Sequence, residues 1–309
     1  MPSSSRPRVA LLVKRTAWQV FVKERSDDRL RGLLKRGDPT VARLRSTHEA
    51  HLRTIDEVSD ALAELHARVT EIPDKPRDLR ASSFDLVLTV GGDGTLLRAS
   101  HFVVDVPILG VNSAPGSSVG FFCGAARGGA LDAIGRALDG RLPSATLARM
   151  RVTRNGRTVA KRVLNDALYC HASPAATSRY IVELGKVVEE HKSSGFWIGP
   201  AAGSTAAQRS AGGKILPLAS QDLQLVVREP YTPLGEKYGI KIGLVKPHQS
   251  LKVRSKMREG VMFFDGPEEC VRLEFGDLVE FCRSDEPLTL LGISPARRRA
   301  QRKTWLPAA

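Results

Sequence analysis

Residues 84–95 read Phe-Asp-Leu-Val-Leu-Thr-Val-Gly-Gly-Asp-Gly-Thr, an apolar run that passes directly into a glycine-rich turn. The apolar part is typical of a buried strand, and glycines at a strand end let main-chain amides approach a phosphate without interference from Cβ atoms. A helix is expected from Leu96 to about Val103, with the positive end of its dipole facing the same turn. We therefore predict a phosphate-binding loop at Gly91–Thr95.

The sequence around this loop alternates between strand and helix patterns. Apolar runs at Val9–Val13 and Pro107–Val111 predict two further buried strands. Between Val41 and Val69 apolar or semi-apolar residues recur three or four positions apart, the spacing of one helix face. Strands that alternate with helices indicate a parallel sheet of the doubly wound α/β type.

The pattern changes near residue 143. Asn155-Gly156 lies between two runs of mixed apolar and basic residues and predicts a hairpin turn. Short strand-like runs then follow at close intervals, which indicates a mainly antiparallel β domain. We expect an α/β domain at residues 1–143, a β-rich domain at 144–286, and a basic segment at 287–309 that packs back on the first domain.

Composition and charge narrow the class of protein. The chain has 309 residues, 42% of them hydrophobic, which excludes general disorder. No apolar stretch approaches about 18 residues, the first residues lack an apolar signal region, and the four cysteines are widely spaced. We therefore expect a cytoplasmic protein with reduced thiols. The formal charge of +14 indicates an anionic partner: nucleic acid, an acidic membrane or a phosphorylated small molecule.

Asp93 is the unusual residue of the glycine loop. A carboxylate is a poor ligand for a phosphate, but it suits a group that holds Mg²⁺ or accepts a proton from an attacking hydroxyl. Three other clusters carry polar or flexible residues suited to a nucleotide. They are Asn165-Asp166, Gly199–Ala207 with Ser210–Gly213, and Asp265-Gly266.

Because it carries all four clusters, the chain resembles the NAD kinase family. Members of that family carry a G-G-D-G-T loop, an Asn-Glu or Asn-Asp pair, a T-G-S-T-A segment followed by S-A-G-G, and a terminal Asp-Gly. All four occur here in the same order, over most of residues 8–285. The basic segment before the loop, the loop at 112–118 and residues 192–195 look more like the mitochondrial-type branch.

The resemblance implies a reaction in which ATP phosphorylates the adenosine ribose 2′-hydroxyl of NAD, with Mg²⁺ bound to ATP. It implies that Asp93 is the catalytic base and that no residue is a protein ligand of a metal. The residues that it places around the phosphates and the dinucleotide are Gly91, Gly92, Gly94, Thr95, Arg98, Asn165, Asp166, Lys192, Ser194, Ser204, Thr205, Ser210 and Asp265. Polyphosphate stays open as the donor and NADH as the acceptor.

This chain departs from the family pattern at three positions. Ala207 stands where an aromatic residue is usual, Ser194 where an aspartate is common, and Pro267 follows the terminal Asp-Gly. None of these positions touches the chemistry expected of Asp93, but all three concern how NAD is held.

Other interpretations remain beside this one. A lipid kinase of the diacylglycerol or sphingosine type shares the G-G-D-G-T loop, and a non-catalytic NAD sensor would fit the altered segment at 200–207. Charge alone would also allow nucleic-acid binding through the Arg297–Lys303 tail, although we expect no specific nucleic acid and no membrane as a partner. We interpret His48 and His51 as helix packing rather than a metal pair and Arg25–Arg45 as a solvated face, and we expect a homo-oligomer, a dimer or tetramer.

Overall fold

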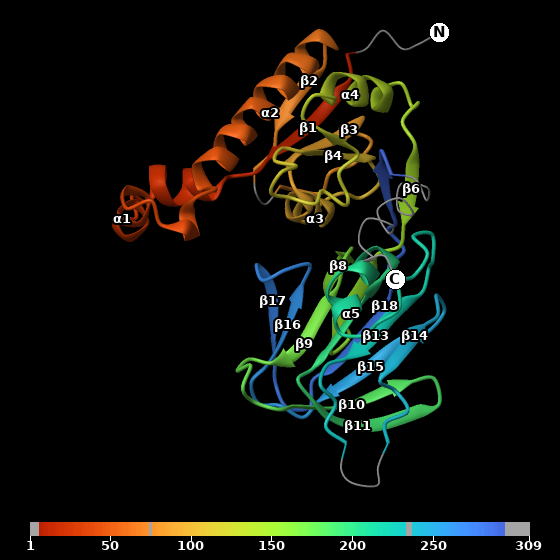
Figure 1. Cartoon of the computed structure of the whole chain (residues 1–309). Coiled ribbons are helices and arrows are strands. Elements are labelled where there is room, and N and C mark those ends of the chain that lie inside the picture. The colour runs from red at the N-terminus through yellow and green to blue at the C-terminus, as the bar shows by residue number, and fades with distance from the viewer. Residues whose placement is uncertain (1–5, 74–75, 233–236, 294–309) are drawn as a thin grey trace, which may run out of the picture. The chain divides into compact units, whose positions relative to one another are not determined.

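The computed structural model describes residues 6–73, 76–232 and 237–293 (Figure 1). The chain forms two compact units, which are described separately below. The first contains the residues up to Ala145 and the segment that begins at Thr289, and the second runs from Thr146 to Leu288. None of the described helices is long and apolar enough to cross a membrane.

The first unit is built on a mainly parallel sheet with the strand order β2-β1-β3-β4-β19-β6, and β5 pairs with β4. The strands are β1 (Arg8–Val13), β2 (Arg68–Glu71), β3 (Leu86–Gly91), β4 (Ile108–Asn112), β5 (Ala125–Ala126), β6 (Ser144–Leu147) and β19 (Leu288–Leu291). Every residue of β3 and β4 is buried, as their apolar runs require of central strands covered on both faces.

Helices cover both faces of this sheet, so the doubly wound α/β expectation is confirmed. On one face, α2 (Leu44–Glu64) and α4 (Ala130–Leu138) bury Val58, Leu62 and Ile134 against the strands. On the other face lies α3 (Asp93–Ser100), close enough that a Cβ at Gly110 of β4 would approach Leu96 to 2.8 Å.

Two helix boundaries differ from the sequence expectation. The helix after the glycine loop begins at Asp93 rather than Leu96, because Gly92 is its N-cap and accepts the first main-chain hydrogen bonds. The long helix is shorter than the apolar stripe suggested. Val41 belongs to a 3-10 turn (Pro39–Val41) before it and Val69 to β2 after it.

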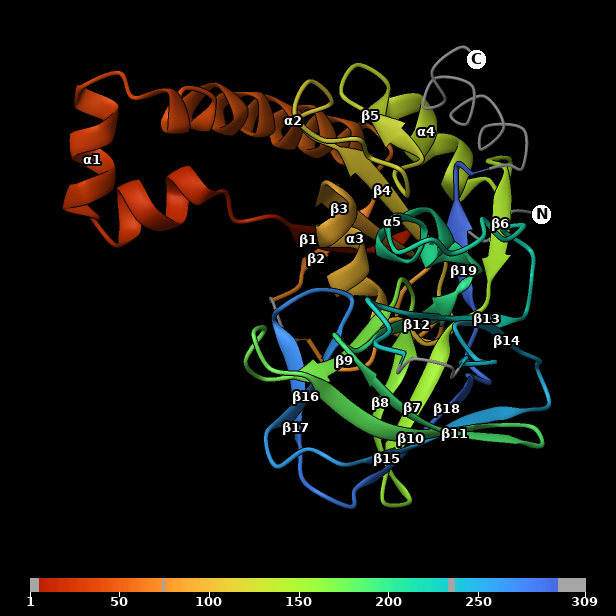
Figure 2. The same ribbon diagram turned by 60° about the horizontal axis from the view of Figure 1, so that its bottom comes forward.

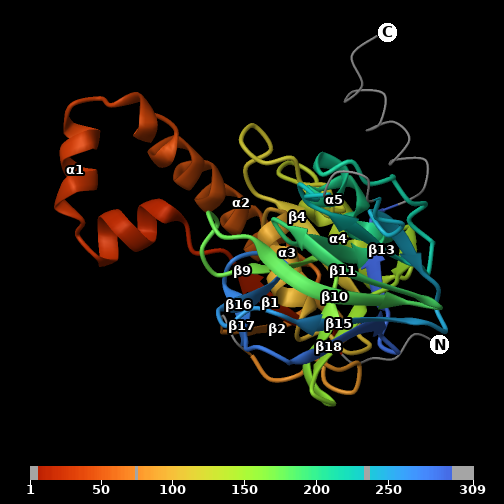
Figure 3. The same cartoon turned by 90° about the horizontal axis from the view of Figure 1, so that it is seen from below.

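The basic segment before α2 forms an arm on the first unit (Figures 2 and 3). A π-helical turn at Trp18–Glu24 and α1 (Asp28–Lys35) contain no fully buried residue. The basic side chains of this arm are exposed, in line with a solvated face for Arg25–Arg45.

The second unit contains two six-stranded antiparallel sheets, with the orders β11-β10-β15-β18-β7-β8 and β14-β13-β12-β9-β16-β17. The strands are β7 (Met150–Arg154), β8 (Arg157–Val163), β9 (Ala167–His171), β10 (Ser178–Leu184), β11 (Val187–Ser193), β12 (Phe196–Pro200), β13 (Leu223–Val227), β14 (Ile242–Val245), β15 (Ser250–Ser255), β16 (Gly260–Phe264), β17 (Glu269–Leu273) and β18 (Leu278–Arg283). The expected antiparallel β domain is confirmed.

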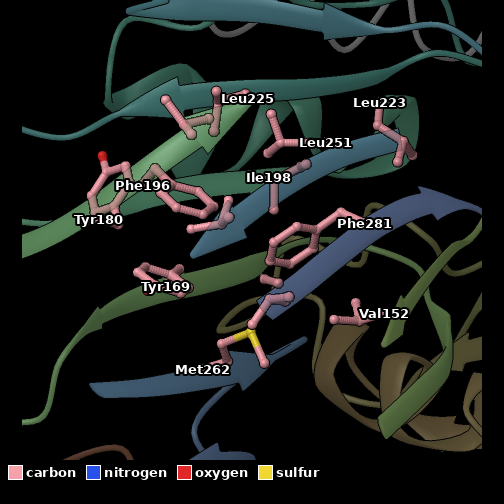
Figure 4. Close-up of a cluster of buried hydrophobic side chains, with 14 of the residues drawn as sticks. Val152, Tyr169, Tyr180, Phe196, Ile198, Leu223, Leu225, Leu251, Met262 and Phe281 are labelled. Atoms are coloured by element: carbon pink, nitrogen blue, oxygen red, sulfur yellow. The ribbon is translucent and has the colours of Figure 1, made fainter. Parts of the chain in front are cut away.

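Apolar side chains from both sheets form a core in the second unit (Figure 4). Tyr169 and Phe196 stack with ring centroids 4.8 Å apart, and Phe281 packs edge-on against Phe196. The predicted turn at Asn155-Gly156 joins β7 to β8, and both residues have positive φ, 50° and 77°, as a two-residue hairpin requires.

The C-terminal segment is described only in part. Strand β19 pairs in parallel with β4 through Leu290 and Ile108, so the described part of residues 287–309 joins the first unit's sheet. Residues 294–309, including the Arg297–Lys303 tail, lie outside the described residues. The four cysteines are described, and each is a free thiol.

Candidate active site

The Gly91–Thr95 loop connects the carboxyl end of β3 to the first turn of α3. A Cβ atom at Gly91 would lie 2.2 Å from Thr95 Oγ1, and one at Gly92 would lie 2.6 Å from Ser118 Oγ. At Gly91 the Cβ of Thr95 would also lie 2.7 Å away, so the close packing of the loop favours glycine there, whereas at Gly92 a rotation of the Ser118 hydroxyl would relieve the contact. Gly94 differs, because a Cβ there would meet nothing within 4 Å and the residue is exposed.

Main-chain amides hold the carboxylate of Asp93 in one orientation. Phe121 N donates to Oδ2 at 2.9 Å and Phe122 N donates to Oδ1 at 2.7 Å. Each carboxylate oxygen has two lone pairs, so each retains one for a further hydrogen bond or a proton. The side chain is partly exposed and can therefore meet a ligand.

Phe121 and Phe122 were not among the residues singled out from the sequence. Their contribution comes from the backbone and depends on Gly120, whose φ of 61° turns the chain toward Asp93. Arg98 lies in the last turn of α3, five residues after Asp93 and so about 7.5 Å further along the helix axis. Its side chain is half-buried.

In the second unit, Asp265 binds the backbone of the Asn165-Asp166 pair. Its Oδ1 accepts hydrogen bonds from Asn165 N at 2.7 Å and Asp166 N at 3.0 Å, and its Oδ2 accepts one from Leu164 N at 2.8 Å. Asp265 N donates in turn to Asp166 O. The sequence indicated Asp265 as a ligand-binding residue; in the structure its carboxylate accepts hydrogen bonds from three amides and shapes the loop that carries Asn165.

Two glycines bring a second backbone segment against the same loop. A Cβ at Gly203 would lie 1.6 Å from Asn165 O, and one at Gly199 would lie 2.4 Å from the same oxygen. Gly199 belongs to β12, and Gly203 belongs to the 3-10 helix Ala201–Thr205 that follows. The glycines of the cluster at 199–207 therefore serve contact between two main-chain segments.

Asp166 is almost fully buried beside Asp265. Burial, and then the negative charge of Asp265, raise the pKa of the Asp166 carboxyl to about 7. Asn165 Nδ2 donates to Asp166 Oδ2 at 3.0 Å, and the Asn165 side chain is half-buried. Asn165 and Asp166 therefore form a hydrogen-bonded pair in which the charge of the Asp166 carboxyl changes near neutral pH.

Buried polar side chains form hydrogen bonds within and next to the segment that contains the 3-10 helix. Gln224 Nε2 donates to Gln208 Oε1 at 3.0 Å and to Lys214 O at 2.9 Å, and both glutamines are fully buried. Ser204 is also fully buried; its hydroxyl donates to Ala201 O and accepts from Leu216 N. Ser204, expected to face the dinucleotide, thus orders the local backbone, and the two glutamines had no sequence signal beyond their polarity.

The remaining expected residues fall into two places. Thr205 ends the 3-10 helix and is half-buried, and Ser210 ends the short helix that follows and is exposed. Lys192 and Ser194 lie before Phe196, whereas Asn165 is next to Gly199 and Pro200 at the other end of β12. The structure therefore brings Asn165, Asp166, Asp265 and the 3-10 helix together and leaves Lys192 and Ser194 at the opposite strand end.

Comparisons with known proteins indicate the family of this chain. Residues 9–134 match the ATP-NAD kinase N-terminal domain. A probable NADH kinase of Oryza sativa subsp. japonica is 37% identical over 226 residues, which cover 66% of this chain and 69% of that protein. The NADH kinase of Arabidopsis thaliana is 36% identical over 249 residues, 70% and 76% of the two chains.

The chain belongs to the NAD kinase family. The fold agrees: the crystal structure of an NAD kinase from Archaeoglobus fulgidus in complex with ATP matches 97% of this chain and 100% of its own, with a TM-score of 0.69 at 18% identity. Membership makes the protein a kinase, and the lipid-kinase and sensor alternatives are not favoured.

The three departures from the NAD kinase pattern lie away from Asp93 in the chain. Ala207 begins the short helix α5 (Ala207–Ser210) and is half-buried, and Pro267 is exposed in the turn after Asp265-Gly266. Ser194 N donates to Arg228 O. All three lie in the second unit.

Substitutions of Asp265 test its role in shaping the loop that carries Asn165 and Asp166. Asn tolerates the positive φ of 51° at this position, and its single oxygen retains two of the three amide hydrogen bonds, whereas Ala retains none. Because a buried amide left unpaired costs about 1–3 kcal/mol, Asp265→Ala should be the less stable variant and Asp265→Asn intermediate. Urea unfolding measures this order; equal stability of Asp265→Ala and wild type would contradict it.

Proposed function

We propose that this protein transfers the γ-phosphoryl group of ATP to the 2′-hydroxyl of the adenosine ribose of NAD, giving ADP and NADP. The observation that carries the proposal is the carboxylate of Asp93, held by two amides at the first turn of α3 in a chain of the NAD kinase family. Such a fixed carboxylate with free lone pairs suits the proton acceptor of a hydroxyl nucleophile.

In the proposed step, the 2′-oxygen forms a bond to the γ-phosphorus while the bond from that phosphorus to the β,γ-bridging oxygen breaks. The hydroxyl proton passes to the Asp93 carboxylate, and ADP leaves with the bridging oxygen. The amides of the Gly91–Thr95 loop and the N-terminus of α3 orient the phosphates. Positioning and charge stabilisation supply most of the catalysis in reactions of this kind.

Mg²⁺ enters this proposal with the phosphates of ATP. Within the described residues, no group of three or more His, Cys, Asp or Glu side chains gathers as a metal site. The ion neutralises phosphate charge when it is bound. No step here is assigned to a protein-held metal.

Asn165 and Asp166 are proposed to hold the adenosine part of NAD, and Asp265 to position them. Thr205 and Ser210 are proposed to contact the dinucleotide near this pair, and Lys192 and Ser194 to contact its other portion, since they lie at the opposite end of β12. Arg98 is proposed to add positive charge near α3. The functional domains are proposed to divide at residues 143 and 286.

The assay that tests the proposal supplies purified protein with Mg²⁺, one donor and one acceptor. ATP and polyphosphate are compared as donors, and NAD and NADH as acceptors, because two relatives carry the name NADH kinase. NADP or NADPH is measured with a dehydrogenase specific for the phosphorylated cofactor. Absence of both products with every pair would overturn the proposal.

We also propose that the protein is a dimer or tetramer and that it is cytoplasmic. Sedimentation tests the oligomeric state, and cell fractionation tests the location.

The raised pKa of Asp166 predicts a pH dependence of NAD binding. An ionised carboxylate accepts hydrogen bonds from ribose hydroxyls more strongly than a neutral one, so KM for NAD should fall as pH rises through about 7. Stability should change in the opposite sense. The Asp166 carboxyl holds its proton more tightly in the folded protein than in the unfolded chain. Its contribution to the free energy of unfolding is therefore complete below the ordinary pKa near 3.8 and is lost as pH rises toward 7.

Asp166→Asn is the control for this prediction. The titration of the nucleotide phosphates is common to both proteins. Only the part of the pH dependence of KM that disappears in Asp166→Asn therefore belongs to this carboxyl. The measurement is KM for NAD at saturating ATP between pH 5.5 and 8.5, values chosen to span the titration at about 7. The same slope in wild type and variant would show that Asp166 does not titrate in the binding step.

A further inference from the structure

The order of strands in the first unit places a second chain segment beside the glycine loop. The chain runs from β1 outward to β2, then returns past β1 to β3 and continues to β4. The helix after β1, α2, and the helix after β3, α3, cover opposite faces of the sheet. In open α/β sheets, ligands bind at such a reversal, beyond the carboxyl ends of the two strands. Here those ends carry Gly91–Thr95 and Lys14–Thr16.

Lys14 is the first residue after β1 and lies against Gly91. Lys14 N donates to Val90 O at 2.9 Å, and the Lys14 Cβ is 3.1 Å from the place where a Cβ on Gly91 would lie. The Lys14 side chain is exposed. In the part of the chain that the structure describes, its ammonium forms no ion pair, whereas the neighbouring Arg15 pairs with Glu24.

Two histidines of α2 hold the segment that carries Lys14. His51 Nε2 lies 2.9 Å from Lys14 O, and His48 Nδ1 lies 2.8 Å from Thr16 Oγ1. Since a carbonyl only accepts, His51 Nε2 carries the proton, and in the neutral ring Nδ1 accepts from the Ser113 hydroxyl at 2.8 Å.

The contacts of His51 extend across three strand ends. Ser113, its second partner, follows β4, and Ser113 N donates to Gly91 O at the end of β3 at 2.9 Å. Burial lowers the pKa of the His51 imidazole and favours its neutral form. His51 therefore joins the carboxyl ends of β1 and β4 directly and that of β3 through Ser113.

We propose that Lys14 binds the phosphates of the nucleotide donor beside the Gly91–Thr95 loop, and that His51 positions it there. The inference rests on the proposed function, because the donor is the ligand concerned. An ammonium group next to the glycine loop supplies the cation that a polyanionic phosphate chain requires, and a charge-assisted hydrogen bond to phosphate is stronger than a neutral one. The role explains why α2 carries buried histidines on its apolar stripe.

The test compares Lys14→Met with two controls. Lys14→Arg retains the charge, and Lys35→Met removes an equal charge from an exposed position at the end of α1. Binding of MgATP, and of inorganic tripolyphosphate as a probe of the phosphate contact alone, is measured by titration without acceptor. Lys14→Met should weaken both about 10- to 100-fold, while Lys14→Arg and Lys35→Met stay within about threefold of wild type and KM for NAD changes little.

The positioning role of His51 is tested by His51→Leu in the wild-type and Lys14→Met backgrounds. In the wild-type background the substitution should weaken tripolyphosphate binding about 3- to 10-fold, and in the Lys14→Met background it should weaken it no further. His51→Gln, which retains a donor and an acceptor, should recover part of the loss. Equal losses in both backgrounds would assign His51 a structural role only.

The outcomes separate this inference from the proposed function. If wild type forms NADP and Lys14→Met binds tripolyphosphate as tightly as wild type, the role of Lys14 is wrong and the proposed function stands. If wild type forms no NADP with any donor, the proposed function fails. Tripolyphosphate binding then still decides whether Lys14 binds phosphate.

Discussion

Asp93→Asn should lower the rate of NADP formation by about 10²- to 10⁴-fold, the usual contribution of a positioned general base. The amide group of Asn does not accept the hydroxyl proton. Its nitrogen would also face a main-chain N–H, because Phe121 N and Phe122 N both donate to the present carboxylate. We therefore expect a second, smaller effect, a loss of about 1–3 kcal/mol in the free energy of unfolding.

The measurement is kcat with ATP and NAD at saturation, together with urea unfolding. Asp105→Asn is the matched control, since Asp105 is exposed and its carboxylate accepts a hydrogen bond from Ala81 N outside the glycine loop. It should retain the wild-type rate. A folded Asp93→Asn protein with near-normal turnover would remove Asp93 from the proposed chemistry.

Gly203→Ala should have the largest effect on stability in the second unit. The added Cβ would lie 1.6 Å from Asn165 O and 2.5 Å from Asn165 C, both backbone atoms that cannot rotate away. Either the 3-10 helix or the Asn165-Asp166 loop must move, and the loop is tied by three hydrogen bonds to Asp265. We expect a loss of more than about 3 kcal/mol, at or beyond the usual cost of overpacking.

Gly116→Ala is the control for this prediction, because a Cβ at Gly116 meets nothing within 4 Å and its φ is not in the left-handed region. Urea unfolding compares the two variants with wild type, and titration with NAD reports on the loop. A Gly203→Ala protein within about 0.5 kcal/mol of wild type would show that the two segments separate easily.

Local sequence patterns were sufficient to predict most of the helices and strands. The apolar runs before Gly91 and at Pro107–Val111 produced buried parallel strands, and Asn155-Gly156 produced its hairpin. Strands β11, β12 and β15 of the second unit were not predicted. Strand β11 carries Glu189, Glu190 and Lys192, and β12 ends in Gly199-Pro200, so neither has the apolar continuity or alternation that identifies a strand. Strand β15 does alternate apolar and polar residues, so its sequence carried a signal.

The same contrast holds for the site. From the sequence alone, Asp93 and the Asn165-Asp166 pair were candidate site residues, and the four ordered clusters carried the resemblance to the family. The sequence did not distinguish the residues that meet a ligand from those that hold others in place. Asp265 and Ser204 share the composition of a binding site, yet their polar atoms bind the protein's own backbone.

That distinction depends on contacts between residues distant in the chain. Asp265 is 100 positions from Asn165, and His51 is 37 positions from Lys14, so no local pattern links the members of either pair. Main-chain amides such as those of Phe121 and Phe122 carry no side-chain signature at all. Residue type and spacing therefore determine which chemistry the chain can perform, and the folded backbone determines which atoms are left free to perform it.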